Sequence, residues 1–568
     1  MKPSTLNYGV DDQPPLVTLI ILGVQQVLMG TVGWVFMAAM LASFATSVVD
    51  TQNILRMGMV VAGVGAILQA NRRGLGGSGY FCPPIVSPAY FSSILLAGSG
   101  YGLPTVFGMT ALAGAGEMVL ARLLPRLRSL FPPEVIGVVM TMVGVAVLPI
   151  GFPRLLADPS TLSVGADPGS NIAVGFIALS VMIGCTVWGR GAVKLFPLLI
   201  GIVAGLIAAW ALDSLPANAF QAVASAPWFD WPHRAVAGLA FEWPLLLPFL
   251  IAGLASSLKN VGDLTICQKI NDTEWQRTDL VSVSRGASAM GLTNILSGLC
   301  GTLSQNTSSS NVGLAVASGA TSRSIAWSFG LLMVLCAFTP KIAGAFAVLP
   351  SPIMGASVIY CACFMMLAGI QILTSRLLDT RRILMAGCAL GFGLSAGLLP
   401  HLYANAPPLL LPIVHSPVSF TALVALVLNY VMQLGSSRSL RLELPVGTDH
   451  YAAIKAELLQ FGASVAARKE VIQAAIDSLH HLMEALDTGL ASGPVTVDIA
   501  FDEFNLDLDV CYQGRPIELV KERPDRDTLL NDPAGLAKLS GWLIGRRTDR
   551  VRVKVDGERC HLLLRLIH

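Results

Sequence analysis

Long apolar stretches alternate with short polar ones from residue 16 to residue 434 of this 568-residue chain. A membrane-spanning helix needs about 20 predominantly apolar residues, and the pattern predicts fourteen such spans. The predicted spans are residues 16–40, 53–71, 80–97, 103–124, 133–151, 171–188, 193–213, 240–258, 283–301, 307–318, 323–345, 350–373, 383–400 and 416–434. We therefore expect an all-α polytopic membrane protein over most of the chain.

The third and tenth of these spans are interrupted by polar and helix-breaking residues. The third opens with GGSGYFCPP from Gly76, and the tenth with QNTSSSN from Gln305. Backbone groups that face lipid without a hydrogen-bond partner are costly, so both segments must be buried in protein or line a cavity. Because each is third in its half of seven spans, the pattern predicts an inverted repeat with a binding site between the two broken spans.

Composition and charge agree with a membrane protein and orient it. Charged residues make up 13% of the chain, against about 25% in an ordinary soluble domain. Positively charged short loops are retained on the cytoplasmic side, so both termini, including a polar tail of residues 1–14, are predicted to be cytoplasmic in a cell (inner) membrane protein. The basic residues gather in the even-numbered loops, for example Arg72, Arg122, Arg190, Arg323 and Arg382.

The pattern changes after the last span. Residues 435–568 are rich in charge, and their periodicity is that of a small α/β cytoplasmic domain. The membrane domain is accordingly assigned to residues 15–434. The elements predicted for the C-terminal domain are a helix over 452–486 interrupted near Gly462, strands within 495–512, a helix over 535–544, and a hairpin over 551–567 that turns at Asp556-Gly557.

A motif begins in the tenth span and continues past its end. It consists of Ser310-Asn311-Val312-Gly313 followed by Ser318-Gly319-Ala320-Thr321-Ser322-Arg323. With further blocks, this motif resembles the nucleobase–ascorbate transporter family, the xanthine/uracil permeases, over about residues 15–434. The further blocks are Gly23–Gln26, Pro132–Gly137, Lys194–Gly201, Val261–Asp263, Arg285–Gly286 and Leu349–Gly355.

The resemblance implies a seven-plus-seven inverted repeat with core and gate domains, in which spans 3 and 10 each contribute a short strand at mid-membrane. It implies a homodimeric secondary-active permease for purine or pyrimidine bases such as xanthine, urate or uracil. The chain departs from the family at several binding positions. Lys259 replaces the usual Glu of span 8, Ser310 replaces the Glu or Gln of span 10, Gln26 replaces the His of span 1, and Met290 stands at an acidic position of span 9.

Lys259 has two interpretations. Its ammonium either attracts an anionic substrate, such as a deprotonated purine, or it pairs with Asp263 one helical turn away or extends toward the cytoplasm. Asp263 is the remaining acid near the expected site, and it is the candidate for ion coupling; it either carries a proton or holds Lys259. No covalent catalysis, metal or cofactor is expected, and coupling to H⁺ or Na⁺ stays open.

The other candidate substrate contacts lie in spans 10, 3 and 1. Ser309, Ser310 and Asn311, with Gly313, either bind the edge of a heterocycle or satisfy the backbone where the span breaks. In spans 3 and 1, the candidates are Tyr80, Phe81 and Gln26. Each of them either contacts the base or contributes only to packing or to helix–helix hydrogen bonding.

Two other functions fit the same pattern. One is a sulfate-type anion transporter or channel on the same plan, and the other is a base sensor that signals through residues 436–568 without transport. The C-terminal domain weakly resembles the ATP-binding fold of histidine kinases, but it lacks that family's metal-binding Asn and Asp-x-Gly-x-Gly motif. We therefore expect a non-catalytic regulatory domain. The expected partners are the base and the bilayer, and no nucleic acid.

Overall fold

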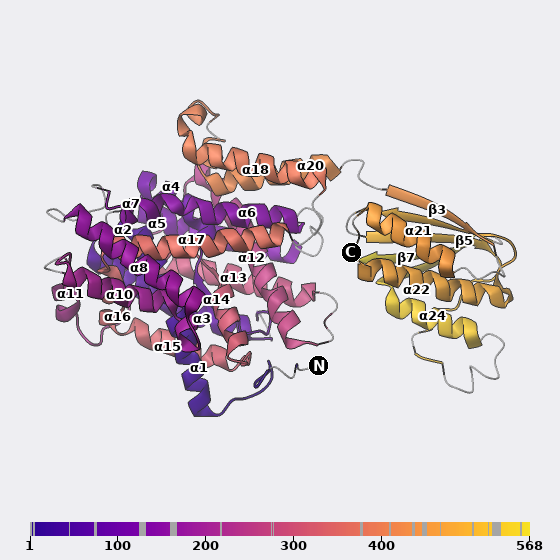
Figure 1. The fold of residues 1–568 in the computed structure, drawn as a ribbon, viewed down its shortest axis with the longest axis horizontal. Coiled ribbons are helices and arrows are strands. Elements are labelled where there is room, and N and C mark those ends of the chain that lie inside the picture. The colour runs from indigo at the N-terminus through magenta and orange to yellow at the C-terminus, as the bar shows by residue number, and fades with distance from the viewer. Residues whose placement is uncertain are drawn as a thin grey trace. The chain divides into compact units, whose positions relative to one another are not determined.

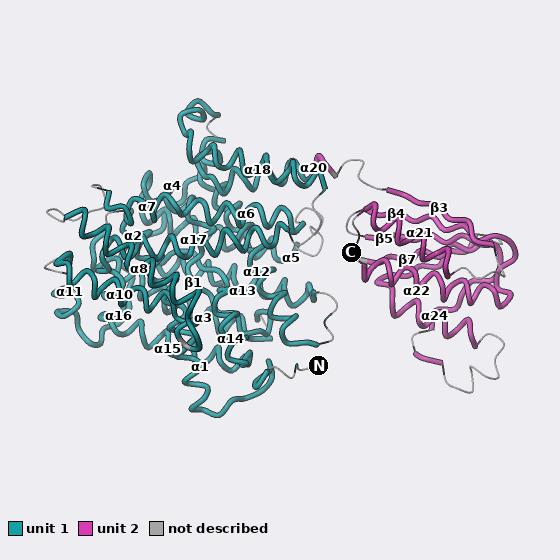
Figure 2. The backbone as a smooth tube through the Cα atoms, viewed as in Figure 1, with its two compact units in different colours: residues 1–429 teal, residues 430–568 magenta. Residues whose placement is uncertain are grey.

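The computed structural model divides into two compact units, Met1–Asn429 and Tyr430–His568, shown in Figure 2. It describes the chain except for residues 1–2, 4–5, 45, 73–75, 124–131, 159–166, 216–218, 274, 276–277, 375–378, 408–409, 434–437, 446–450, 466, 468, 503–504, 521, 525–534, 557–558 and 568. The expected linker after residue 434 and the hairpin residue Gly557 lie outside the described residues.

The first unit is helical apart from two short strands, as Figure 1 shows. Its helices up to the middle of the unit are α1 (Leu16–Met29), α2 (Thr31–Ala42), α3 (Val48–Ala70), α4 (Phe91–Tyr101), α5 (Leu103–Leu123), α6 (Pro133–Ala146), α7 (Leu148–Leu155), α8 (Pro168–Trp188), α9 (Ala192–Leu195), α10 (Pro197–Ala211) and α11 (Ala219–Ser225). The later ones are α12 (Leu246–Asn271), α13 (Leu280–Cys300), α14 (Ser309–Ala317), α15 (Ile325–Ala337), α16 (Pro340–Ala347), α17 (Ser351–Leu373), α18 (Thr380–Leu398), α19 (Leu411–Val414) and α20 (Pro417–Gln433). Short 3₁₀ turns lie at η1 (Pro88–Tyr90), η3 (Trp243–Leu245) and η4 (Pro400–Tyr403).

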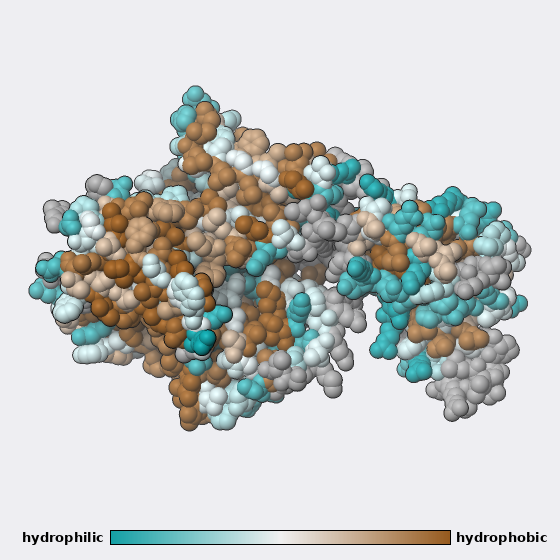
Figure 3. Space-filling view, in the orientation of Figure 1, coloured by the Kyte–Doolittle hydropathy of each residue, from teal (hydrophilic) through white to brown (hydrophobic). Residues whose placement is uncertain are grey.

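Many helices of this unit are apolar enough for a bilayer. In the described part of the chain, seven helical stretches are long and apolar enough to cross a membrane, or eight if α15 and α16, bent by 80°, form one span. Large apolar side chains remain exposed on α8 and α10, including Trp188 at 78% and Trp210 at 74%, and Figure 3 shows extensive apolar surface there. Apolar surface on this scale is typical of contact with lipid rather than water. The chain is thus built as a multi-pass membrane protein.

The two broken spans form the short strands that the family resemblance implied. β1 (Pro84–Val86) precedes α4, and β2 (Gln305–Thr307) precedes α14. They pair antiparallel with Pro84 opposite Thr307 and Val86 opposite Gln305. Two further bonds extend the ladder, from Ser308 N to the Pro83 carbonyl at 3.0 Å and from Ser87 N to the Ser304 carbonyl at 2.9 Å. The pairing satisfies backbone groups that no helix satisfies here.

Local sequence explains where α13 stops and α14 starts. Gly301 has φ 72°, a left-handed conformation that ends α13 and that glycine adopts without strain. Ser308 then caps α14, because its hydroxyl accepts a hydrogen bond from the backbone N–H of Asn311. Every residue from Gly301 to Ser308 is buried. The polar stretch is therefore placed inside protein, as its position in the membrane domain requires.

Glycine pairs let the helices around these strands approach closely. A Cβ atom added at Gly63 on α3 would lie 2.6 Å from the carbonyl oxygen of Gly330 on α15, and the reverse distance is 2.7 Å. Gly114 on α5 and Gly291 on α13 make the same kind of contact, at 2.6 and 2.7 Å. Small residues at such crossings are the usual means of close helix packing in membranes.

The second unit is a one-sided antiparallel sheet covered by helices. Its strand order is β3-β4-β5-β7-β6, and side chains alternate, so that Val495, Val497 and Ile499 are buried while Asp498 is exposed. The strands are β3 (Arg438–Leu444), β4 (Val495–Phe501), β5 (Asn505–Gln513), β6 (Arg550–Asp556) and β7 (Arg559–Ile567); the helices are α21 (Tyr451–Ser464), α22 (Lys469–Ala485) and α24 (Gly535–Arg547), with a π-helical turn η5 (Leu486–Leu490).

The predicted interruption of the helix near Gly462 is confirmed. α21 continues through Gly462 to Ser464, and α22 begins at Lys469. A Cβ atom at Gly462 would lie 2.6 Å from Cγ1 of Ile472, so this glycine allows α21 and α22 to pack closely. Strand β3, which pairs with β4, was not predicted.

We predict that Gly63→Val destabilises the protein by about 1–3 kcal/mol or more, because the added atoms meet a carbonyl group that cannot move aside. Thermal unfolding of the detergent-solubilised protein measures the effect. Gly387→Val on α18 is the matched control, because no atom lies within 4 Å of a Cβ added there. Equal stability of the two variants would show that the α3–α15 approach is not tightly packed.

Candidate functional site

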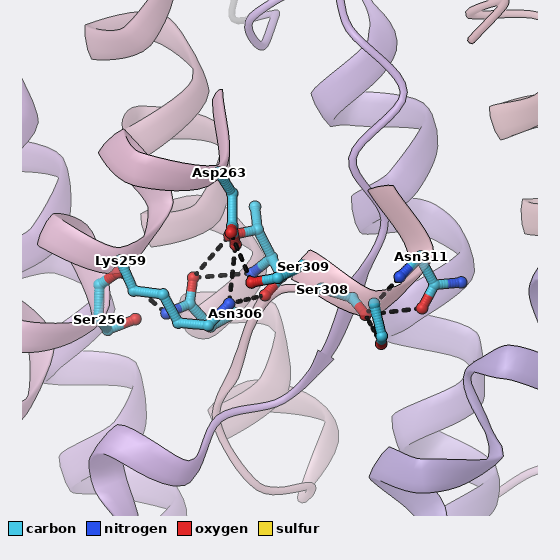
Figure 4. Close-up of polar contacts among 9 residues, drawn as sticks. Ser256, Lys259, Asp263, Asn306, Ser308, Ser309 and Asn311 are labelled. Atoms are coloured by element: carbon cyan, nitrogen blue, oxygen red, sulfur yellow. Dashed lines mark hydrogen bonds and ion pairs between the residues drawn. The ribbon is translucent and has the colours of Figure 1, made fainter. Parts of the chain in front are cut away.

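Asp263 on α12 is the centre of a polar cluster beside strand β2 (Figure 4). Its Oδ2 atom accepts a hydrogen bond from Lys259 Nζ at 2.7 Å and from Thr307 Oγ1 at 2.6 Å, and its Oδ1 accepts from Ser309 Oγ at 2.6 Å. The side chains of Lys259 and Asp263 are only 15% and 5% exposed. The ion pair that one interpretation of the sequence expected is therefore formed, one helical turn apart on α12.

The same cluster ties α12 to the backbone of β2. Lys259 Nζ also donates a hydrogen bond to the carbonyl oxygen of Thr307, and Asn306 Nδ2 donates to the carbonyl oxygen of Ser256 at 2.9 Å. The Oδ1 atom of Asn306 accepts from the backbone N–H of Thr307 at 2.7 Å. Side chains of α12 and β2 thus satisfy groups that the short two-stranded ladder leaves open.

Asn311 and Gln26 form a second hydrogen-bonded arrangement, between α14 and α1. Asn311 Nδ2 donates to the backbone carbonyl of Gln26 at 2.9 Å and to its Oε1 atom at 2.8 Å. Asn311 Oδ1 accepts from Ser308 Oγ at 2.6 Å. Because both amides are buried and engaged with each other, they join α1 to α14.

Ser309, Ser310 and Gly313 lie on the open side of α14. Ser309 and Gly313 are exposed and Ser310 is half-buried. A Cβ atom added at Gly313 would meet nothing within 4 Å, and the same holds at Gly262, three residues after Lys259 on α12. Residues three or four apart share a helix face, so Gly313 leaves open space on the face of α14 that carries Ser309 and Ser310, and Gly262 leaves open space on the face of α12 that carries Lys259.

Tyr80 and Phe81 are not part of this cluster. The Phe81 ring is 3% exposed and packs edge-on against Phe329, with ring centroids 6.2 Å apart. Together with Asn271 and Thr321, Tyr80 and Phe81 line a small cavity that none of the cluster side chains lines.

A second buried polar network, which the sequence interpretation missed, contacts the first residue of β2, Gln305. Glu117 on α5 is 1% exposed. Its carboxyl group accepts hydrogen bonds from Tyr90 Oη at 3.0 Å and Asn294 Nδ2 at 2.8 Å, and Asn294 Oδ1 accepts from the backbone N–H of Gln305 at 2.7 Å. The signal was present in the sequence, because Glu117 is the single acid of the predicted span 103–124, and an intramembrane acid is a candidate functional residue.

The N-terminal tail explains the setting of Arg323 in the motif. Tyr8 N donates to the Gly319 carbonyl at 3.0 Å, Thr321 N to the Tyr8 carbonyl at 2.8 Å, and Arg323 N to the Val10 carbonyl at 3.0 Å. Arg323 also forms an ion pair with Asp11. The segment that follows α14 is thereby held by the tail.

Comparisons with known proteins agree with this architecture. A family model described as the Permease family matches residues 17–402, all within the first unit. The candidate purine permease CPE0397 of Clostridium perfringens is 27% identical over 431 residues, which cover 75% of this chain and 93% of that protein. The xanthine permease XanP of Escherichia coli K12 is 25% identical over 442 residues, which cover 75% and 95%.

A solved structure shares the fold. The murine anion transporter Slc26a9, in its inward-facing state, matches with a TM-score of 0.51 at 10% identity, over 77% of this chain and 71% of that one. At this level of identity, the match establishes a common fold and nothing about the substrate.

We predict strong energetic coupling between Lys259 and Asp263. Lys259→Ala leaves a buried carboxylate without its cation, which is expected to cost about 3–5 kcal/mol, and Asp263→Ala leaves the ammonium without its anion. The double variant removes both charges, so its loss of stability should be smaller than the sum of the single losses by about 1–3 kcal/mol. The coupling is measured by thermal unfolding, in detergent, of the wild type, the two single variants and the double variant. Additive losses would contradict a direct pair.

Proposed function

The chain belongs to the Permease family, and we propose that it is a secondary-active transporter of purine or pyrimidine nucleobases such as xanthine, urate or uracil. The observation that carries the proposal is the pairing of two broken spans beside the Lys259–Asp263 cluster. Broken spans of this kind are where secondary transporters bind their substrates. The names of the relatives, xanthine permease and purine permease, support the substrate class.

The cluster has the chemistry to recognise the edge of an oxopurine. A lysine ammonium has three N–H donors, and two are engaged by Asp263 and the Thr307 carbonyl. The third is available to a carbonyl oxygen of a base. The first backbone N–H groups of α14, those of Ser309 and Ser310, have no acceptor within the helix and add donors along the exposed edge. The Ser310 hydroxyl donates to Ser308 Oγ at 2.9 Å, because the Ser308 proton goes to Asn311 Oδ1, so its oxygen offers an acceptor there.

The charges of the cluster argue against the sulfate-type alternative. Lys259 is neutralised by Asp263 at 2.7 Å, so a doubly charged anion would gain little from this pair. A neutral heterocycle with alternating donors and acceptors is better matched. In this proposal, the edge that contacts the substrate is formed by Lys259, Ser309, Ser310 and Gly313. The other candidate residues have a structural role, because they pack or hydrogen-bond within the protein around this edge.

The finer parts of the proposal concern topology and assembly. The first unit crosses the membrane fourteen times in a seven-plus-seven arrangement, both termini are cytoplasmic in the inner membrane, and the protein is a dimer that works by alternating access. The basic residues of the even-numbered loops support the orientation. Residues 435–568 form a regulatory domain rather than an enzyme.

We predict that proteoliposomes containing the protein take up radiolabelled xanthine, and that Gly313→Val lowers this uptake by about tenfold or more. The added side chain would occupy the unfilled space beside Ser309. Gly387→Val is the control and is expected to transport normally.

Competition separates the alternatives. Excess unlabelled xanthine, urate or uracil should reduce uptake, and sulfate should not. Inhibition by sulfate alone would favour the anion transporter, and saturable xanthine binding without any uptake would favour the sensor.

A further inference from the structure

The Glu117 carboxyl group has only neutral partners. Tyr90 Oη donates to Oε1 at 3.0 Å and Asn294 Nδ2 donates to Oε2 at 2.8 Å. Within the described residues, no ion pair joins Glu117 to a Lys, Arg or His side chain. A charged carboxylate in such a buried position is costly unless it is compensated.

In the described part of the chain, the groups that contact Glu117 are also uncharged, and they include the hydroxyl of Ser256 on α12. On α12, a Cβ atom added at Gly253 would lie 2.8 Å from Tyr90 Oη and 3.1 Å from Glu117 Cγ. The backbone of α12 therefore packs directly against both side chains. Tyr90 is the titratable group in contact with Glu117 in the described part of the chain. Lys259 is six residues farther along α12, about 9 Å along its axis, and is already engaged by Asp263.

The hydrogen bonds determine which carboxyl oxygen can carry a proton. The backbone N–H of Gln305 can only donate, so Asn294 must present its Oδ1 atom to it, at 2.7 Å. Asn294 therefore presents Nδ2 to Glu117, and Oε2 of Glu117 must act as an acceptor. The Tyr90 hydroxyl, by contrast, can donate or accept. A proton thus fits on Oε1 without disturbing Asn294.

We propose that Glu117 is the proton-binding residue of the transport cycle, that Oε1 is the protonated oxygen, and that Tyr90 changes from donor to acceptor when the proton binds. This inference rests on the proposed transport function. Through Asn294, Glu117 acts on Gln305 at the start of β2, while Asp263 holds Thr307 at its end. Substrate and proton would therefore act on the same three-residue strand, and Asp263 keeps its role as the partner of Lys259.

Glu117→Gln tests the proposal, because glutamine reproduces the protonated group. Its carbonyl can accept from Asn294 and its NH₂ can donate to Tyr90. In proteoliposomes, we expect accumulation of xanthine driven by an inward proton gradient to fall by about tenfold or more. Exchange of xanthine across the membrane should become independent of pH, and trapped pyranine should report no proton entry with substrate.

Glu134→Gln is the matched control, because Glu134 is also buried but lies 3.4 Å from Arg382; it should retain the response to the proton gradient. Accumulation and proton entry that persist in Glu117→Gln would overturn the assignment of Glu117 while leaving the transport function intact. Absence of xanthine uptake and exchange in the wild type would instead reject the proposed function.

A second variant covers the case in which Glu117→Gln does not fold. Tyr90→Phe removes the hydroxyl that donates to the carboxylate, so the pH midpoint of xanthine exchange should rise by about one unit. Glu117→Asp, which keeps an acid, should retain coupling with a reduced rate. An unchanged pH profile in Tyr90→Phe would overturn the placement of the proton on Oε1.

Discussion

The need to satisfy backbone groups where two membrane helices are broken governs the rest of this structure. A helix interrupted inside a bilayer exposes N–H and C=O groups that lipid cannot satisfy. Here β1 and β2 satisfy part of this demand by pairing with each other. The side chains of Lys259, Asn306 and Asn294 satisfy much of the remainder by bonding to the backbone of β2 or of its neighbours. The polar residues of the site are thus first of all the structural solution to the breaks.

This dual role explains why structural and functional interpretations of the same residues need not exclude each other. Lys259 holds both Asp263 and the Thr307 carbonyl, and it still has one N–H to offer. Ser308 caps α14, and its buried hydroxyl is fully engaged within the protein. Ser310, two residues farther along the chain, keeps part of its surface exposed. The Ser310 oxygen is therefore available to a ligand as an acceptor, while its proton is donated to Ser308 Oγ.

The hydropathy pattern was sufficient to predict the two interruptions, and the four-residue spacing of Lys259 and Asp263 allowed the ion pair as one of two interpretations. The two short strands were expected from the family resemblance rather than from local pattern. The network around Glu117 was not predicted, although a lone acid in span 103–124 was visible. Its partners come from η1 and α13, and they meet because α5 and α13 approach at Gly114 and Gly291. A close approach between distant segments leaves no local signature.

The role of Gly462 itself likewise depends on a contact between separate segments. A glycine inside a helical pattern can end the helix or permit close packing, and the contact with Ile472 selects the second outcome. Strand β3 was missed since its alternation, from Arg438 to Leu444, is short and strongly charged. Its assignment depends on pairing with β4, which lies about fifty residues farther along the chain.

The replacement of an acid by Lys259 changes what kind of ligand edge the site can accept. A carboxylate at that position would accept hydrogen bonds from ring N–H groups, whereas an ammonium can only donate. Because Asp263 cancels its charge at 2.7 Å, Lys259 selects by hydrogen-bond direction more than by attraction of an anion. In the proposed function, Lys259 and the first backbone N–H groups of α14 consequently offer donors, and the Ser310 oxygen, whose proton goes to Ser308 Oγ, offers an acceptor. A ligand that fits this edge must offer a carbonyl oxygen or an unprotonated ring nitrogen to Lys259 and to the start of α14, and it can place a ring N–H against Ser310.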